Sequence, residues 1–396
     1  MNDREHDSKG ISTRAVHSGE PRGRPYDAVA TPVVNSATFA FRDTAELAAH
    51  VEGRVVRDEY GRYGNPTVRA LEQKLAALEG CADAAAFASG MAAITTTLLA
   101  LLKSGSHMVL AGGGYRRTRQ FCATVLERFG VNCTIVESTK VDDLSAAMRP
   151  GTRLVLVELP TNPFLRVIDL PRLVERARAR HVWVLVDATF ATPVNFRPAE
   201  HGADLVIHSA TKYLAGHNDV LSGIVAGPDN LVSLVRELRH VLGGVCDPHA
   251  AWLVARGMKT LPLRVRQQNA TALALARLLE PQAKVRAVHY PGLASHPDHT
   301  VARALLTGAG GVVTYQLDTD AAGAARYLDA LRLARIAPSL GGVESLAEPP
   351  ALMSYGDVPA PERQRLGMHD SLIRHSVGIE DLDDVLLDVE QALAHV

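Results

Sequence analysis

The chain has 396 residues, of which 47% are hydrophobic and 21% charged, and its formal net charge is −1 at pH 7. The composition predicts a soluble globular protein. The chain is too long to form a single small core, so a large and a small domain are expected. A net charge so close to zero supplies no bulk field for nucleic acid or an anionic membrane. We therefore expect neither nucleic acid nor membrane as a partner.

Cysteine spacing and the N-terminal residues narrow the class further. The four cysteines, Cys81, Cys122, Cys133 and Cys246, lack metal-ligand spacing, so free thiols and no metal are expected. Residues 1–10 are polar and lack the apolar core of a signal peptide. No apolar stretch is long enough to span a bilayer. The sequence predicts a cytoplasmic protein.

In chain order, residues 1–57 come first and contain only short apolar runs among Pro, Gly, Arg and small polar residues. Such a segment makes a poor core alone, which predicts an N-terminal arm lying on other protein surface. A helix is predicted from about residue 67, because apolar residues recur at helical spacing at Val68, Leu71, Leu75 and Leu78.

Strands and helices then alternate. The predicted strands are 85–88, 107–111, 132–136, 154–159, 182–187, 204–208 and 223–226, and the predicted helices include 91–102 and 170–179. This alternation predicts a mostly parallel sheet with helices on both faces. A helical stretch follows over 228–280, with 269–279 amphipathic. Strands at 285–289, 311–317 and 372–377, with helices at 321–331 and 382–395, predict a second, smaller sheet. We expect an α/β fold with a large domain at 58–255 and a small α+β domain at 256–396.

Residues 204–218 read DLVIHSATKYLAGHN. An apolar run ends in the hydroxyl residues Ser209 and Thr211, and Lys212 follows directly. A lysine amine can form a Schiff base, and hydroxyls beside it can hold a phosphate, which is what pyridoxal phosphate (PLP) requires. Taken alone, the segment fits a strand end, a helix cap and a solvated lysine about equally well.

Upstream, the near-continuous apolar run 182–187 ends in Asp187. It predicts a buried parallel strand with a carboxylate at its carboxyl end, where ligands bind in open α/β sheets. A carboxylate there can keep a pyridine nitrogen protonated, which makes the ring an electron sink. Together, Lys212 and Asp187 predict a PLP site.

These residues resemble those of the Cys/Met-metabolism family of PLP enzymes, which includes cystathionine γ-synthases and γ-lyases, methionine γ-lyases and O-acylhomoserine sulfhydrylases. Further matching motifs follow in family order over roughly residues 12–396: YGRYGNPT at 60–67, Ser89-Gly90-Met91, ELPTNP at 158–163, RGMKTL at 256–261, SLGGVESL at 339–346 and LIRHSVGIED at 372–381. The resemblance implies the fold-type I, aminotransferase-like architecture with PLP as the cofactor.

The resemblance also implies roles for single residues. Lys212 would carry PLP and move the substrate's α-proton, for which desolvation would lower its pKa. Gly90 and Met91 match phosphate-binding amides at a helix N-terminus, and Ser209 and Thr211 match the accompanying hydroxyls. By itself, the segment Ser89–Met91 fits an ordinary helix start equally well.

Two further motif positions concern the ring and the neighbouring subunit. In the family, the pair at Tyr60 and Arg62 crosses a dimer interface and binds the partner's phosphate, for which the arginine fork is suited. This implies a homodimer or homotetramer, with dimer contacts from the arm at 1–57; a turn with a solvated arginine is the alternative. Tyr115 follows a glycine run at 112–114 and would stack on the ring and assist proton movements; a core tyrosine is the alternative.

Substrate contacts are implied at three positions. Arg374 lies in an apolar strand, where an unpaired buried charge would be costly, so bidentate capture of an α-carboxylate is expected. Ser339 and Asn162 match supporting contacts to that carboxylate and to the ring hydroxyl. Glu158 matches a motif position whose role in the family pattern can be structural.

Three departures affect the expected substrate. Arg116 and Arg117 replace small residues, Pro338 replaces the glutamate typical of enzymes acting on cystathionine, and Met-Thr-His becomes Met-Ser-Tyr at 353–355. These changes favour a substrate whose distal group, the one far from the α-carbon, is anionic or neutral. They count against cystathionine as the main substrate. If the two arginines face solvent or a dimer interface, this argument loses its force.

The implied reaction is PLP-dependent γ-replacement on an activated homoserine-like amino acid through a vinylglycine-type ketimine, as in transsulfuration. A γ- or β-lyase that degrades a sulfur amino acid to a 2-oxo acid and ammonia is the alternative. A catalytically silent binding protein fits less well, because Lys212, Asp187, Tyr115 and Arg374 are all retained.

Overall fold

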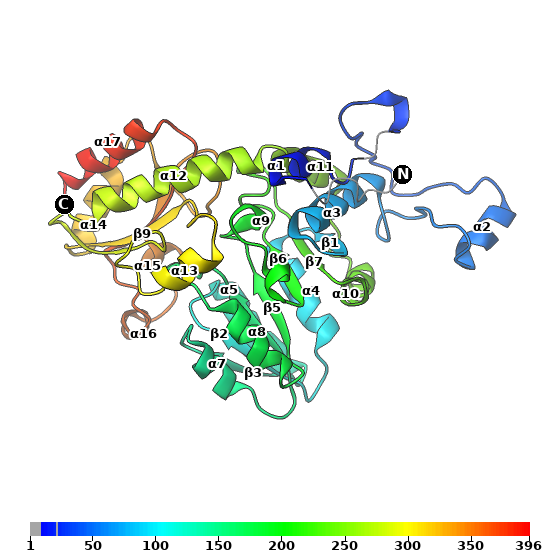
Figure 1. Cartoon of the computed structure of the whole chain (residues 1–396), viewed down its shortest axis with the longest axis horizontal. Helices are drawn as coiled ribbons and strands as arrows, with labels where there is room; N and C mark the ends of the chain where they lie inside the picture. Colours follow the sequence, from blue (N-terminus) through cyan, green and yellow to red (C-terminus); the bar gives the residue numbers. More distant parts are fainter. Residues whose placement is uncertain (1–8, 21–22) are drawn as a thin grey trace.

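The computed structural model describes residues 9–20 and 23–396 (Figure 1). The helices in this part of the chain are α1 (Ile11–His17), α2 (Thr44–Val51), α3 (Pro66–Glu79), α4 (Gly90–Leu101), α5 (Arg116–Gln120), α6 (Leu126–Arg128), α7 (Val141–Ala147), α8 (Leu170–Arg178), α9 (Thr192–Asn195), α10 (Asp229–Leu242), α11 (Pro248–Met258), α12 (Leu261–Leu279), α13 (His299–Leu305), α14 (Ala321–Ala330), α15 (Pro350–Met353), α16 (Ala360–Arg365) and α17 (Leu382–Leu393). Short 3-10 helices lie at η2 (Pro25–Asp27) and η4 (Pro198–His201), and a π-helix, η3 (Phe121–Val125), joins α5 to α6.

The strands are β1 (Asp83–Phe87), β2 (His107–Ala111), β3 (Asn132–Val136), β4 (Thr152–Glu158), β5 (Trp183–Asp187), β6 (Leu205–His208), β7 (Gly223–Gly227), β8 (Val285–His289), β9 (Val312–Leu317), β10 (Arg335–Ile336), β11 (Leu346–Glu348) and β12 (Leu372–Ser376). Seven form a main sheet in the order β1-β7-β6-β5-β4-β2-β3, in which only β7 runs against the others. Five form a smaller, mostly antiparallel sheet, β10-β11-β12-β9-β8. The predicted fold class, α/β with a mostly parallel central sheet, is confirmed.

Helices cover both faces of the main sheet, which explains why its central strands are largely apolar. Along β5, Val184 and Val186 enter a core shared with α7 and α8. Leu185, which points to the other face, enters a core shared with α4 and α10. Both faces of β5 are therefore buried, and its carboxyl end, where Asp187 lies, is the part that can contact a ligand.

A third core joins the main sheet to the smaller one. It contains buried residues of α3, α11, α12, α17, β9 and β12. The helical stretch predicted at 228–280 consists of the separate helices α10, α11 and α12, and the last runs beside the small sheet (Figure 1). The predicted boundary at 255/256 falls inside α11, so the division into 58–255 and 256–396 stays a prediction.

The predicted N-terminal arm has two parts in the structure, apart from residues 1–8 and 21–22, which lie outside the described residues. The first part, α1, packs on its own chain, where Lys74 Nζ donates to the carbonyl of Ala15 at 2.9 Å and lies 3.2 Å from a carboxylate oxygen of Glu20. The second part, around α2, extends away from the body of the molecule (Figure 1). A dimer contact by this second part stays a prediction.

The predicted strands and helices agree with the structure to within a few residues, but two strands of the small sheet were missed. These are β10 and β11, of two and three residues, which are too short to show an alternating pattern. None of the described helices is long and apolar enough to cross a membrane.

Candidate active site

The site lies where the carboxyl ends of the parallel strands meet. Asp187 ends β5 and is paired in register with Glu158 of β4 and Ile207 of β6. Lys212 follows β6 by one turn. A cavity of about 410 Å³ is lined by Lys212, Asp187 and Arg374 among others. The structure therefore brings together three groups from three separate segments of the chain.

Lys212 is held near the small domain. Its Nζ donates to Ser339 Oγ at 2.6 Å. Burial lowers the pKa of Lys212 to about 8, the positive charge of Arg374 adds to this, and Glu348 opposes it. A buried lysine with such a pKa has a substantial fraction of neutral amine near pH 8, which is the form needed for nucleophilic attack and proton transfer.

Asp187 is fixed by the residues that follow it. Thr189 donates its hydroxyl and its N–H to Asp187 Oδ1, at 2.5 and 3.0 Å. The Thr189 hydroxyl also accepts the N–H of Ser209 at 2.8 Å, which ties the end of β5 to the lysine segment. Burial raises the pKa of Asp187, while the two bonds from Thr189 and the nearby His208 lower it. Thr189 was not predicted from the sequence as part of the site.

The predicted phosphate cradle lies at the N-terminus of α4. Ser89 caps this helix by accepting the N–H of Ala92 at 3.1 Å. A Cβ on Gly90 would come within 2.9 Å of the Ser209 Cβ, so only glycine fits there without displacement. Ser89, Gly90, Met91, Ser209 and Thr211 all line the cavity. The side chain of Ser89 therefore has a structural role as the helix cap.

Arg374 already has a carboxylate partner within its own chain. Glu348 lies directly opposite it across the β11–β12 ladder, and their side chains form an ion pair at 3.0 Å. Arg374 also donates to Asn162 Oδ1 at 3.1 Å and to the carbonyl of Ser339 at 2.9 Å, whereas its Nε has no partner among the described residues. Sequence reasoning missed Glu348; its only signal was an acidic residue in an apolar run.

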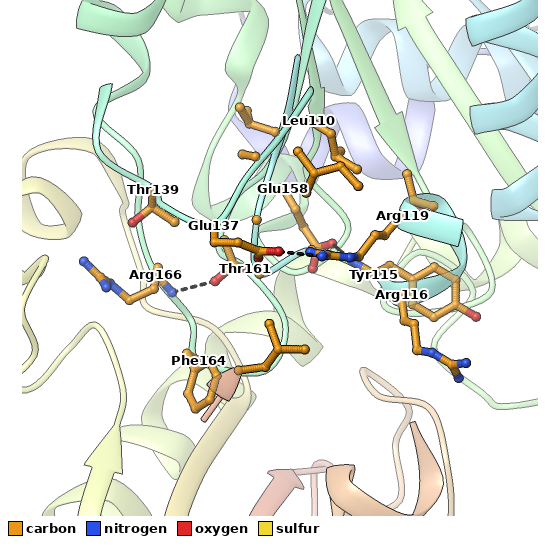
Figure 2. A pocket seen from close by; sticks show the side chains of 18 of the residues that line it. Leu110, Tyr115, Arg116, Arg119, Glu137, Thr139, Glu158, Thr161, Phe164 and Arg166 are labelled. Atoms are coloured by element: carbon orange, nitrogen blue, oxygen red, sulfur yellow. Dashed lines mark hydrogen bonds and ion pairs between the residues drawn. The ribbon is translucent and has the colours of Figure 1, made fainter. Parts of the chain in front are cut away.

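Tyr115 and Glu158 are connected. The N–H of Tyr115 donates to Glu158 Oε2 at 2.7 Å. Burial and the negative charge of Asp187 raise the pKa of Glu158 well above its ordinary value. Figure 2 shows both residues at an adjoining cavity of about 460 Å³, which shares them with the Lys212 cavity. Tyr115 is 46% exposed and is therefore not a core tyrosine.

Arg116 and Arg117 both line the Lys212 cavity, but their charges are not equally available. Arg116 donates to the carbonyl of Ser354 at 3.0 Å and forms an ion pair with Asp357. Arg117 donates to Gln120 at 2.7 Å and is exposed. Asp357 therefore offsets part of the positive charge on which the predicted substrate preference rests.

Tyr60 and Arg62 lie away from Lys212 in the single chain. Arg62 donates to the carbonyl of His240 at 2.5 Å and to the Tyr63 hydroxyl at 3.1 Å, and its guanidinium lies 5.6 Å from the Tyr60 ring. Neither Tyr60 nor Arg62 lines the Lys212 cavity. Their predicted contact with the phosphate of a partner subunit stays a prediction.

The residues of the cavity fit PLP. The amine of Lys212 suits its carbonyl, and the buried carboxylate of Asp187 suits its pyridine nitrogen. The helix N-terminus at Gly90, with the hydroxyls of Ser209 and Thr211, suits its phosphate. No group of His, Cys, Asp and Glu within residues 9–20 and 23–396 could hold a metal ion. The fold and this site define a PLP-dependent enzyme of fold-type I.

Comparison with known proteins gives the family. The chain belongs to the Cys/Met metabolism PLP-dependent enzymes, whose family model matches residues 12–394. It is 48% identical to cystathionine γ-synthase 1, chloroplastic, of Nicotiana tabacum over 96% of this chain and 71% of that protein. It is 42% identical to the L-methionine γ-lyase of Pseudomonas putida over 97% of both. The crystal structure of cystathionine γ-synthase from Xanthomonas oryzae pv. oryzae with aminoacrylate and cysteine superimposes with a TM-score of 0.92, at 35% identity and 98% coverage of both chains.

Proposed function

We propose that this enzyme replaces the γ-substituent of an activated homoserine with a sulfur nucleophile. The observation that carries the proposal is the position of Ser339 between two functional groups. Its hydroxyl accepts from Lys212 at 2.6 Å, and its carbonyl accepts from Arg374 at 2.9 Å. Ser339 thereby holds a guanidinium, which suits the carboxylate of an α-amino acid, close to the lysine that PLP requires. The similarity to proteins named cystathionine γ-synthase supports the same reaction.

Each residue has a task in this reaction. PLP, when bound, supplies an electron sink for negative charge next to the substrate's amino group. Arg374 binds the substrate's carboxylate, and Asn162 holds the guanidinium in place. Lys212 accepts the proton from Cα, because its lowered pKa of about 8 leaves a neutral amine available. Tyr115, which lines the cavity, would stack on the cofactor ring and assist proton movements.

The distal part of the substrate lies near Arg116 and Arg117 in this proposal. Because Asp357 pairs with Arg116, Arg117 supplies most of the free positive charge. This arrangement supports a leaving group or nucleophile that is anionic or neutral. The product is a thioether amino acid. Full-length similarity to an L-methionine γ-lyase favours, as the second candidate, elimination to a 2-oxo acid and ammonia.

The two reactions are separated by feeding the enzyme homoserine esters with and without L-cysteine. Replacement predicts cystathionine with cysteine present and little 2-oxobutyrate without it. Rapid 2-oxobutyrate and ammonia formation that cysteine does not suppress would identify a lyase.

The preference for a charged distal group is tested by comparing a phosphate ester with an acetyl ester of homoserine in the Arg116→Gly, Arg117→Gly double variant. A partly desolvated charge contact is worth about 1–3 kcal/mol, so the phosphate ester should lose roughly five- to hundredfold in kcat/KM and the acetyl ester little.

The complete site is proposed to include a second copy of the chain. Tyr60 and Arg62 match the family's phosphate-binding pair but lie away from the cavity of their own chain. They follow the segment around α2, which extends from the body of the molecule (Figure 1). A homodimer, or a homotetramer built from two such dimers, would bring the pair to the neighbouring cavity.

A further inference from the structure

Glu348 is a buried carboxylate with no assigned task. It ends β11 and faces Arg374 of β12 in register, with their side chains 3.0 Å apart. It lines the same cavity as Lys212. The charged and polar groups that face it come from three elements: Arg374, Lys212 after β6, and the hydroxyl of Ser354 after α15, which donates at 3.3 Å.

The charge balance of this cluster changes when an amino acid enters. Without substrate, Glu348 neutralises Arg374, which would otherwise be a buried and uncompensated cation. An α-amino acid arrives as a zwitterion, and its carboxylate brings a second anion to the same guanidinium. Its ammonium group carries a proton that must leave before the nitrogen can act as a nucleophile.

We propose that Glu348 accepts this proton from the substrate's α-ammonium group. The inference rests on the proposed function in that the substrate is an α-amino acid. An N–H bond of the ammonium breaks, its electron pair stays on nitrogen, and an O–H bond forms on Glu348. The net charge of the site is conserved, because the substrate's carboxylate takes the place of Glu348 as counter-ion of Arg374.

The surroundings of Glu348 suit this exchange. Burial raises its pKa, whereas Arg374 and Lys212 lower it. When the substrate's carboxylate shares Arg374, the stabilisation of the ionised Glu348 weakens, so its affinity for a proton rises at the moment when one is offered. A carboxyl group on a strand that is held by register also keeps a fixed position relative to Arg374.

The test counts protons released when the PLP-loaded enzyme binds L-norvaline, an α-amino acid without a γ-leaving group. Calorimetric titrations in two buffers of different ionisation enthalpy give this number without any turnover. Glu348→Gln, which keeps the shape but cannot accept the proton, should release about one more proton per bound ligand than the wild type. The affinity of Glu348→Gln for L-norvaline should also increase about tenfold for each unit by which the pH is raised, as long as the pH stays below the pKa of the free amino group. The wild type should lack this dependence.

Two further variants make the result specific. Glu348→Asp keeps a carboxylate and should return the proton count towards that of the wild type. Glu390→Gln, an exposed position on α17, should match the wild type. Equal proton counts and equal pH dependence in the wild type and Glu348→Gln would overturn the inference and leave the proposed function standing. No binding of L-norvaline to the wild type would instead overturn the amino-acid substrate and this inference with it.

Discussion

Replacing Arg374 with methionine leaves Glu348 as a buried carboxylate without its counter-ion. The two side chains are only 5% and 2% exposed and lie 3.0 Å apart. Removing one partner of such a buried pair costs about 3–5 kcal/mol. The lost bonds to Asn162 and to the carbonyl of Ser339 add about 1 kcal/mol each at most. We expect a loss of roughly 3–7 kcal/mol in the free energy of unfolding.

The loss should depend on pH in a defined direction. The pKa of Glu348 is raised in the folded protein even with Arg374 present, so ionisation of this group disfavours the folded state as the pH rises above its unfolded-state pKa. Arg374 lowers that pKa, and its removal raises it further. The difference in unfolding free energy between wild type and Arg374→Met should therefore be larger at pH 8 than at pH 5.

The assay is urea unfolding followed by far-UV circular dichroism, at equal PLP concentration and at both pH values. A matched control is Arg286→Met, which breaks an ion pair with Asp318 whose side chains are 62% and 50% exposed. An exposed pair contributes about 0–1 kcal/mol, so this variant should change little. The double variant Arg374→Met, Glu348→Gln should recover much of the loss. If Arg374→Met costs no more than Arg286→Met, or if the second change recovers nothing, the reasoning about the buried pair is refuted.

Three further outcomes follow from the same site. Borohydride reduction of the wild type with PLP should label Lys212, and Lys212→Ala should lose both label and turnover. A label on another lysine would contradict the assignment. An amine reagent should react with Lys212 of the wild-type apoprotein with a midpoint near pH 8, its lowered pKa. Gly90→Ala forces a Cβ to within 2.9 Å of Ser209, so overpacking should cost about 1–3 kcal/mol and weaken PLP binding. In the control Gly244→Ala, the nearest atom lies at 3.7 Å, and an equal effect there would count against the close approach. An Arg62→Ala protein mixed with a Lys212→Ala protein should regain part of the activity if sites are shared between subunits, and no recovery despite subunit exchange would argue for self-contained sites.

Local pattern was sufficient for much of the fold. The apolar run before Asp187 and the hydroxyls before Lys212 lie within single segments, and period and end residues alone predict a buried strand and a turn there. Because parallel strands present their carboxyl ends at one edge, the sequence also predicted that Asp187 and Lys212 would meet. The structure confirms both, with the two residues lining one cavity.

Pairing between distant segments was decided only by the tertiary structure. The β11–β12 register places Glu348 opposite Arg374, and strands as short as β11 carry no readable period. Asp357, separated by 241 positions from Arg116, pairs with it and offsets the charge on which a substrate argument was based. A local segment specifies which side chains it carries and which way they alternate. It does not specify the partner that burial brings to them, because that partner is fixed by strand register and by the packing of the two sheets.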